Sequence, residues 1–364
     1  MRGLALARDL ARSNLPGAHR PFKLTLVLNY ACNCRCAMCD IWKRPSRGEM
    51  TVEEIETFFR RESRWSWINL SGGEILMKKG AEEIIDIVTR SNQRLYLLDF
   101  PTTGFRPERL EGLARRALAG GPARVAISVS LDGPQEVHER IRQAPGLFAQ
   151  AVESLRRLRS IGDDRLIVKA GMTLIPANVD HVDDLLDGLR RSVPGFAAED
   201  LHLNLAQESE HYYDNAGSEA LGGDAHRVRA LETIARHRTR VRPRGAVGRL
   251  EDRFLGDLAA FAKDGRSVYS CRALRSSVFI DPFWNLFPCI TWNRPLANLR
   301  ELDFDLTAAL ATRDVSSTRD EIAARQCPDC WTACEAYQTI LGHAGHAAWR
   351  TLTRKSTSSH GDRP

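Results

Sequence analysis

Between positions 23 and 205 the sequence alternates apolar strand patterns with helix patterns, and this alternation constrains the fold more than any other feature. Helix-start signals separate the apolar runs, for example Thr51 followed by Glu53 and Glu54. We expect strands at 23–29, 67–70, 95–100, 124–130, 166–174 and 201–205, and helices at 51–61, 81–90, 107–118, 146–161 and 179–189. The alternation predicts a parallel α/β sheet, and six strand–helix units predict an open, partial (β/α)6 TIM-like barrel.

The loop after the first strand contains Cys32, Cys36 and Cys39 in a Cys-x3-Cys-x2-Cys spacing. Three thiolates can hold three irons of a 4Fe-4S cubane and leave the fourth iron open to a small molecule, which a four-cysteine electron-transfer site cannot do. Cys34 lies inside the first gap. Because the spacing is complete without Cys34, we expect this residue not to be a ligand.

This spacing resembles that of the radical S-adenosylmethionine (radical SAM) enzymes, and further motifs follow in the family's order. The second strand runs into Gly72-Gly73-Glu74, which is similar to the Gly-Gly-Glu turn that binds the amino group of the methionine moiety in that family. Glycines at this turn let the backbone approach a ligand closely. Ile75 stands where many members have proline. The resemblance implies that Gly72, Gly73 and Glu74 bind S-adenosylmethionine.

The fourth strand ends in a segment that resembles the family's Ser-Leu-Asp-Gly motif, and an arginine follows. The resemblance implies that Ser130 and Arg142 hold the ribose or carboxylate of S-adenosylmethionine, and a guanidinium fork suits a carboxylate. The alternative for Arg142 is a surface arginine on a helix. We expect Asp132 to cap the turn before Pro134. Met38 takes the place of an aromatic that touches adenine in relatives, and its thioether can pack on a ring face.

Five further cysteines are concentrated in the last quarter of the chain: Cys271, Cys289, Cys327, Cys330 and Cys334. The segment between the first two indicates a β-hairpin turning near positions 282–285. Together they resemble the SPASM and twitch extensions of radical SAM enzymes, in which a hairpin and a later Cys-x2-Cys bind an auxiliary 4Fe-4S cluster. A full SPASM module has seven cysteines for two clusters, so five favour one cluster, with the first four as ligands and Cys334 spare or substituting. On spacing alone, a zinc knuckle is the alternative.

Length and composition favour one large domain with a smaller one. The chain has 364 residues, of which 43% are hydrophobic and 27% charged, enough to bury a sizeable core. We expect an N-terminal amphipathic segment at 1–22, the barrel at 23–215, a helical linker at 216–265, a cluster-binding extension at 266–345 and a disordered tail at 351–364.

The charge and apolar patterns bear on location and partners. No apolar run approaches the roughly 20 residues of a membrane span, and Arg2, Arg8 and Asp9 interrupt the N-terminal apolar residues, which disfavours a secretory signal. We therefore expect the nine cysteines to meet a reducing cytoplasm, where clustered thiols indicate metal ligands. The net charge of +6 forms no basic stripe, which argues against nucleic acid. Residues 1–13 form an amphipathic helix pattern that we expect to pack on the barrel, with membrane-surface contact as the alternative.

The resemblance also implies the chemistry. Flavodoxin or ferredoxin would reduce the first cluster, S-adenosylmethionine would be cleaved to methionine and a 5′-deoxyadenosyl radical, and the radical would abstract hydrogen from an unactivated carbon. A second, auxiliary 4Fe-4S cluster could accept an electron, which would make the reaction an oxidoreductase-like net oxidation. Peptide-modifying members of the family often carry a peptide-recognition domain ahead of the barrel, and a first strand near Lys23 leaves no room for one, so we expect a small metabolite as substrate or a separately encoded recognition partner. Modification of a ribosomal peptide and carbon–carbon coupling on a lipid-like substrate are alternatives, and a non-catalytic metal-binding or electron-carrier protein is a remote one.

The loop after the sixth strand, at 205–215, is dense in polar and aromatic residues. We expect Glu208, His211, Tyr212 and Tyr213 to contact substrate or accept a proton. A solvated loop with ordinary packing tyrosines is an equal alternative.

Overall fold

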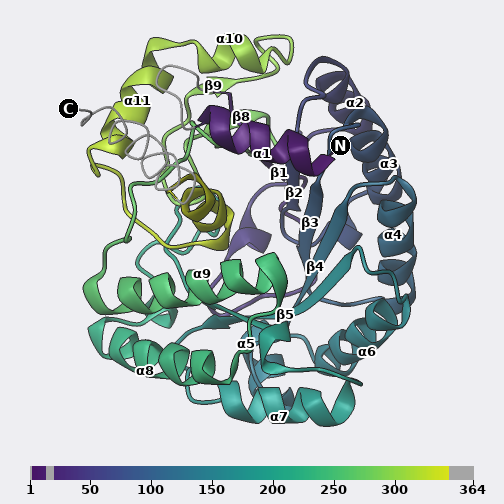
Figure 1. The fold of residues 1–364 in the computed structure, drawn as a ribbon, viewed down its shortest axis with the longest axis vertical. Helices are drawn as coiled ribbons and strands as arrows, with labels where there is room; N and C mark the ends of the chain where they lie inside the picture. The colour runs from purple at the N-terminus through teal and green to yellow at the C-terminus, as the bar shows by residue number, and fades with distance from the viewer. Residues whose placement is uncertain (1, 14–19, 344–364) are drawn as a thin grey trace, which may run out of the picture.

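The computed structural model describes residues 2–13 and 20–343, and one nine-stranded sheet with the order β6-β5-β4-β3-β2-β1-β7-β8-β9 forms its centre. Six parallel neighbours build the barrel: β1 (Lys23–Val27), β2 (Trp67–Ser71), β3 (Leu97–Thr102), β4 (Arg124–Ser130), β5 (Leu166–Leu174) and β6 (Leu201–Leu205). The sheet is curved and does not close on itself (Figure 1). The predicted partial barrel is therefore confirmed.

Helices cover the outer face of these strands in an arc (Figure 1). They are α2 (Val52–Arg61), α3 (Ala81–Ser91), α4 (Pro107–Ala119), α6 (Leu147–Ser160) and α7 (Val182–Ser192). Helix α2 begins where the sequence predicts, because Thr51 Oγ1 accepts the N–H of Glu54 at 3.2 Å while the Glu54 carboxylate accepts the N–H of Thr51 at 2.9 Å. The sequence pattern does not predict the eight-residue α5 (Gln135–Arg142).

The C-terminal region continues the barrel sheet. Strand β7 (Ser277–Ile280) pairs in parallel with β1, and β8 (Asn285–Phe287) and β9 (Ala297–Asn298) follow as antiparallel neighbours. The predicted hairpin is thus present, and it extends the barrel sheet without a break. The region also contains α8 (Asp224–Arg240) and α9 (Gly245–Asp264) in the expected helical linker, and α10 (Leu306–Leu310) and α11 (Arg313–Ala323) after the strands.

A last helical stretch at residues 333–343, here called the 333–343 helix, lies across the ends at which the barrel strands begin. The ammonium of Lys23, the first residue of β1, donates to Gln338 Oε1 at 3.1 Å. The hydroxyl of Ser277, the first residue of β7, donates to Glu335 at 2.6 Å. The Tyr337 hydroxyl donates to Glu251 of α9 at 2.5 Å. The amino end of the barrel is therefore covered by this helix.

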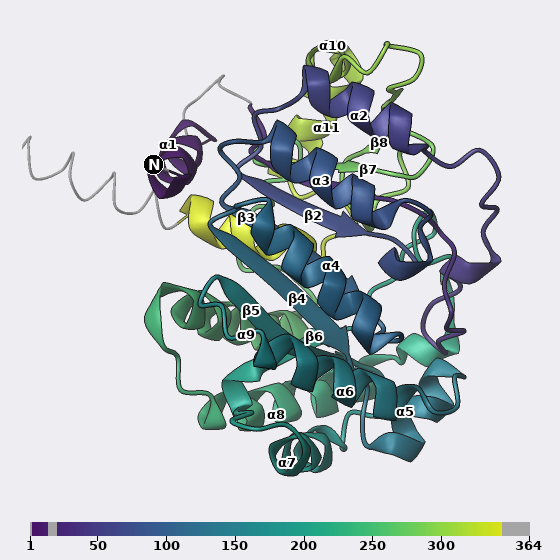
Figure 2. The same ribbon diagram turned by 90° about the vertical axis from the view of Figure 1, so that its right-hand side faces the viewer.

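Helix α1 (Arg2–Ser13) packs at the same end of the barrel (Figure 2). Its Asp9 carboxylate accepts the hydroxyl of Ser66, which directly precedes β2, and pairs with Arg94 at 2.8 Å. This is the packing that we expected for residues 1–13. No helix in the described part of the chain is long and apolar enough to cross a membrane. The expected disordered tail at 351–364 lies outside the described residues.

Candidate active site

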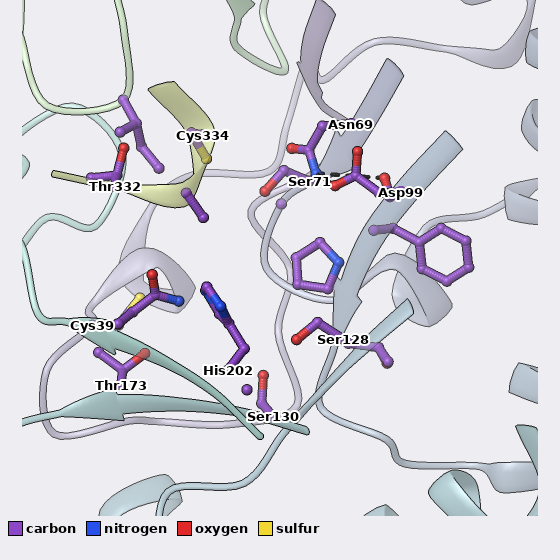
Figure 3. Close-up of a pocket in the computed structure, with 18 of the residues that line it drawn as sticks. Cys39, Asn69, Ser71, Asp99, Ser128, Ser130, Thr173, His202, Thr332 and Cys334 are labelled. Atoms are coloured by element: carbon purple, nitrogen blue, oxygen red, sulfur yellow. Dashed lines mark hydrogen bonds between the residues drawn. The ribbon is translucent and has the colours of Figure 1, made fainter. Parts of the chain in front are cut away.

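A cavity of about 360 Å³ lies inside the barrel. Cys32, Cys36 and Cys39 line one part of it, and the inward-facing side chains of β2 to β6 line most of the remainder. Figure 3 shows that Cys39 and Cys334 approach this space from the first cysteine loop and from the 333–343 helix. The cavity therefore joins the first cysteine group to one member of the C-terminal group.

The Gly-Gly-Glu turn fixes the cysteine loop. The N–H of Gly73 donates to the carbonyl of Asn29 at 2.9 Å, and the N–H of Glu74 donates to the carbonyl of Ala31 at 2.9 Å. A Cβ atom on Gly73 would lie 2.3 Å from the Ala31 oxygen, and one on Gly72 would lie 2.6 Å from the Asn29 oxygen. The glycines are thus required by the close approach of two backbones, in addition to the ligand contact that we expected. Both glycines also line the cavity.

The side chain of Glu74 binds groups of the protein itself. Its buried carboxylate accepts the N–H of Thr103 at 2.6 Å, the hydroxyl of Thr102 at 2.8 Å and the N–H of Leu76 at 3.1 Å. Burial raises the pKa of this carboxyl. Glu74 is not among the residues that line the cavity. Its side chain joins the carboxyl ends of β2 and β3, and the expected part of Glu74 in binding S-adenosylmethionine stays a prediction.

Two further segments hold the cysteine loop. The N–H of Ala37 donates to the carbonyl of Ile141 at 2.8 Å, which ties the loop to the end of α5. The N–H of Asp40 donates to the carbonyl of Tyr213 at 2.8 Å, which ties it to the loop after β6. These contacts hold the cysteine loop against α5 and the loop after β6.

Cys34 differs from its neighbours in position. It is buried and does not line the cavity, whereas the other three cysteines of the loop do. A hydrogen bond from Cys34 lowers the pKa of the Cys36 thiol to about 7. The expectation that Cys34 is not a ligand stays a prediction, and its position agrees with it.

Arg142 is anchored beside the cavity by a buried ion pair. Its Nε lies 2.6 Å from Asp132 Oδ2, and Asp132 is fully buried while Arg142 is 8% exposed. The other Asp132 oxygen accepts the N–H of Thr173 at 3.0 Å. The interpretation of Arg142 as a surface arginine is therefore wrong. Asp132 does not cap the turn before Pro134 with its carboxylate either, because both oxygens are used to hold Arg142 and the end of β5.

Met38 and Ser130 both line the cavity, as do Gly72, Gly73 and Arg142. The structure thus brings five of the six residues expected to bind S-adenosylmethionine to one space, and Glu74 is the exception.

The loop after β6 contributes two of its four expected residues. Tyr212 and Tyr213 line the cavity. The Tyr212 hydroxyl donates to the carbonyl of Gly72 at 3.1 Å and lies 2.8 Å from the Ser71 hydroxyl. Burial raises the pKa of Tyr212, so this phenol stays neutral. Tyr212 therefore links the loop to the Gly-Gly-Glu turn.

The structure places the other two expected residues, Glu208 and His211, away from the cavity. Glu208 is exposed, and the His211 ring stacks on Phe287 of β8 with ring centroids 4.3 Å apart. Neither residue lines the cavity. Burial lowers the pKa of His211 to about 4, so the ring is neutral and packs as part of a buried aromatic cluster. Their positions do not support the predicted contact with substrate.

Sequence reasoning missed a set of polar residues on the inner face of the strands. Those that line the cavity include Asn69, Asp99, Ser128, Lys169 and His202. Asp99 accepts the Nδ2–H of Asn69 and the indole N–H of Trp67 (Figure 3 shows the first). These residues lie at every second position of otherwise apolar strands, where side chains share one face. This period of two was the signal that could have identified them.

The C-terminal cysteines lie near one another. Burial is the largest cause that raises their pKa values, and the charge of neighbouring thiolates adds to it. The charge of Cys289 raises the pKa values of Cys271, Cys330 and Cys334, and that of Cys327 raises the pKa of Cys330. Burial raises the pKa of Cys289 to about 11 and that of Cys334 to about 12. Of the five, Cys334 lines the cavity. The ligand set itself stays a prediction.

Both sets of cysteines, in the first loop and in the C-terminal region, are suitable ligands for iron–sulfur clusters, since cysteine thiolates are the usual ligands of such clusters. A single zinc ion needs its sulfurs roughly 3.8 Å apart, because Zn–S bonds are about 2.3 Å long. Within the residues that the structure describes, no three His, Cys, Asp or Glu side chains are arranged to share one metal ion.

The sequence model of the Radical SAM superfamily matches residues 26–189. This stretch is a radical SAM domain. It contains Cys32, Cys36 and Cys39, the Gly-Gly-Glu turn and the anchored arginine. The superfamily uses a 4Fe-4S cluster and S-adenosylmethionine. These are the cofactors of the domain, so residues 26–189 form a radical SAM domain within this chain.

Curated relatives are similar at modest identity. The antilisterial bacteriocin subtilosin biosynthesis protein AlbA of Bacillus subtilis (strain 168) is 24% identical over 277 residues, which are 74% of this chain and 55% of the relative. The sporulation killing factor maturation protein SkfB of the same organism is 24% identical over 173 residues, which are 47% of this chain and 40% of the relative. The chain therefore spans about half the length of the curated relatives it matches.

Two solved structures show the same fold. Streptococcus suis SuiB bound to S-adenosylmethionine aligns with a TM-score of 0.60 and 14% identity over 87% of this chain and 71% of that chain. The anSMEcpe protein with bound AdoMet and Cp18Cys peptide aligns with a TM-score of 0.58 and 13% identity over 93% of this chain and all of that chain (100%).

Proposed function

We propose that this radical SAM enzyme abstracts a hydrogen atom from a carbon of a ribosomally made peptide. The observation that carries the proposal is the shared cavity, which is lined by Cys32, Cys36 and Cys39 and also by Cys334. A peptide side chain inserted there would lie between the first cysteine group and Cys334 of the C-terminal group. An oxidoreductase-like net oxidation would follow if the second cluster accepts an electron.

The names of the relatives support a peptide substrate. AlbA is named for the biosynthesis of a bacteriocin, SkfB for the maturation of a killing factor, and one SuiB structure contains the precursor peptide SuiA. Sequence reasoning preferred a small metabolite because the first strand begins near Lys23. We now favour the peptide, which was its alternative.

The chain's own residues would divide the work as follows. Cys32, Cys36 and Cys39 would hold the cluster whose chemistry, when bound, is the reductive cleavage of S-adenosylmethionine, and flavodoxin or ferredoxin would be the electron source. Arg142, which Asp132 holds in place, would bind the methionine carboxylate, because a fixed guanidinium suits that group. Ser130 would contact the ribose and Met38 the adenine.

The inner polar residues would hold the substrate. Asn69 is 7% exposed, lines the cavity, and has an Oδ1 atom without a hydrogen-bond partner in the described chain. This Oδ1 atom is itself shielded, whereas the half-buried Asp99 carboxylate lines the cavity as an acceptor. Asp99 would bind a substrate group that carries N–H or O–H donors.

A small metabolite is the second candidate. A volume of about 360 Å³ lies at the lower end of the range of small-molecule pockets. The cavity could therefore enclose a small polar molecule as well as one peptide side chain.

The test uses anaerobically reconstituted protein with S-adenosylmethionine and dithionite. We expect 5′-deoxyadenosine from the wild type and from Cys34→Ala, and none from Cys36→Ala, although these cysteines are two positions apart. Candidate precursor peptides labelled with deuterium at carbon are then added. Transfer of deuterium into 5′-deoxyadenosine supports the proposal. Deuterium transfer from labelled small polar metabolites but from no peptide would contradict it.

A further inference from the structure

Lys23 is a buried cation at the amino end of the barrel. It is 2% exposed, although lysine is rarely buried without partners. Its Nζ donates to Gln338 Oε1 at 3.1 Å and to the carbonyl oxygen of Cys334, and it lies 4.3 Å from the centre of the Trp67 ring. Lys23 also lines the cavity. Its ammonium is therefore held against the residue of the C-terminal cysteine group that reaches the cavity.

The charge of this ammonium acts on three acidic groups. Burial raises the pKa values of Asp99, Glu335 and Cys334, and in each case the charge of Lys23 is a principal opposing influence. Asp99 faces the cavity, whereas Glu335 and Cys334 belong to the 333–343 helix. One cation thus stands at the junction between the cavity and the C-terminal cysteines.

A second lysine lines the same cavity and provides a comparison. Lys169 of β5 donates to the carbonyl of Glu199, and its charge acts on Glu251. It is not among the principal charges that act on Cys334, whereas Lys23 is. The two lysines therefore share the cavity and differ in whether they act on the C-terminal cysteine group.

We propose that Lys23 is a positioning residue that holds the 333–343 helix on the barrel and raises the reduction potential of the iron–sulfur cluster bound by the C-terminal cysteines. The proposal rests on the proposed function only in requiring that second cluster. Reduction adds one negative charge to a cluster, and a nearby buried cation stabilises that charge in a medium of low dielectric constant. Little mobile salt reaches a buried pair, so screening is weak.

A raised potential suits a cluster that accepts electrons better than one that donates them. The inference therefore connects Lys23 to the direction of electron flow in a net oxidation. Because its ammonium donates to the carbonyl of Cys334, we expect Lys23 to influence the second cluster more than the first.

The experiment isolates the second cluster in a chain that carries Cys32→Ala, Cys36→Ala and Cys39→Ala. In this background, Lys23→Met removes the charge, Lys23→Gln removes the charge but keeps an N–H donor, and Lys169→Met is the matched control. Each protein is reconstituted anaerobically, its iron content is determined, and its midpoint potential is measured by titration followed by electron paramagnetic resonance.

We expect both Lys23 variants to be harder to reduce than the background and than Lys169→Met. A tenfold fall in the ratio of reduced to oxidised cluster at a fixed potential corresponds to a shift of about 59 mV for one electron. Potentials equal to that of Lys169→Met in both Lys23 variants would overturn the proposal. If Lys23→Met fails to fold, Lys23→Gln decides the question.

Two further outcomes separate this inference from the proposed function. A background chain that binds no iron would overturn the tuning role, while 5′-deoxyadenosine formation by the wild type would still support radical chemistry. If the midpoint potentials shift in the Lys23 variants as expected but no peptide transfers deuterium, the role of Lys23 stands and the peptide substrate is contradicted.

Discussion

Replacing Gly73 with alanine tests whether the Gly-Gly-Glu turn builds the first cluster site. The new Cβ atom would lie 2.3 Å from the Ala31 oxygen and 2.7 Å from the Tyr30 oxygen, and both are backbone atoms that no side-chain rotation can move. The turn and the cysteine loop must separate, which breaks the bonds from the N–H groups of Gly73 and Glu74, both 2.9 Å long. Two buried hydrogen bonds are worth about 2 kcal/mol, and overpacking adds about 1–3 kcal/mol, so we expect a loss of about 3–5 kcal/mol.

The assay combines anaerobic urea unfolding with iron analysis after reconstitution. The control is Gly188→Ala, because a Cβ atom there meets nothing within 4 Å and the position is inside α7. We expect the control to gain about 0.5–1 kcal/mol and to keep its iron. Gly73→Ala should lose stability together with about four irons. Unchanged unfolding and unchanged iron in Gly73→Ala would refute the argument that close backbone contact sets the cysteine loop.

Two further predictions concern buried charges. Asp132→Asn leaves the Arg142 guanidinium without its charged partner at 2.6 Å. Calorimetry should then show weaker binding of S-adenosylmethionine, and urea unfolding should show a loss of about 3–5 kcal/mol of stability. Unchanged affinity would argue against a ligand role for Arg142. Burial alone would raise the pKa of Glu251, but His202 lowers it to about 2, so this carboxylate stabilises the fold above its unfolded pKa of about 4.3 and loses that effect as the pH falls through 2. Glu251→Gln should therefore destabilise the cluster-free chain in urea unfolding above that pKa, and an unchanged cost at pH 2 would contradict this reasoning.

The barrel could be predicted because its signals are local. Strands β4, β5 and β6 begin and end where the apolar runs do, and Thr51 starts α2 by a capping box. The pairing of β7 with β1 could not be predicted, because it joins residues about 250 positions apart and no local pattern specifies that register. The placement of the 333–343 helix depends on the same kind of long-range contact.

The candidate site shows the same division. Cysteine spacing is a local property, so Cys32, Cys36 and Cys39 could be identified directly. Glu208 and His211 were chosen by residue type, and their direction depends on how the loop packs against β8, which the sequence does not specify. In contrast, the inward-facing polar residues of the strands were predictable from their period of two.

The role of Asp132 depends on contacts between elements that are distant in the sequence. Its aspartate-before-proline context is a common turn signal. Its partners, Arg142 and the N–H of Thr173, come from α5 and β5 and become visible only when the barrel is assembled.

The central claim is that the two cysteine groups hold two iron–sulfur clusters, and the most direct test is the iron and sulfide content of anaerobically reconstituted protein, with Mössbauer spectra to define the cluster type. The wild type is compared with the chain in which Cys32, Cys36 and Cys39 are all replaced by alanine. We predict about eight irons in the wild type and about four in the variant, both as 4Fe-4S clusters. About four irons in the wild type and none in the variant would contradict the claim, because the C-terminal cysteines would then hold no cluster.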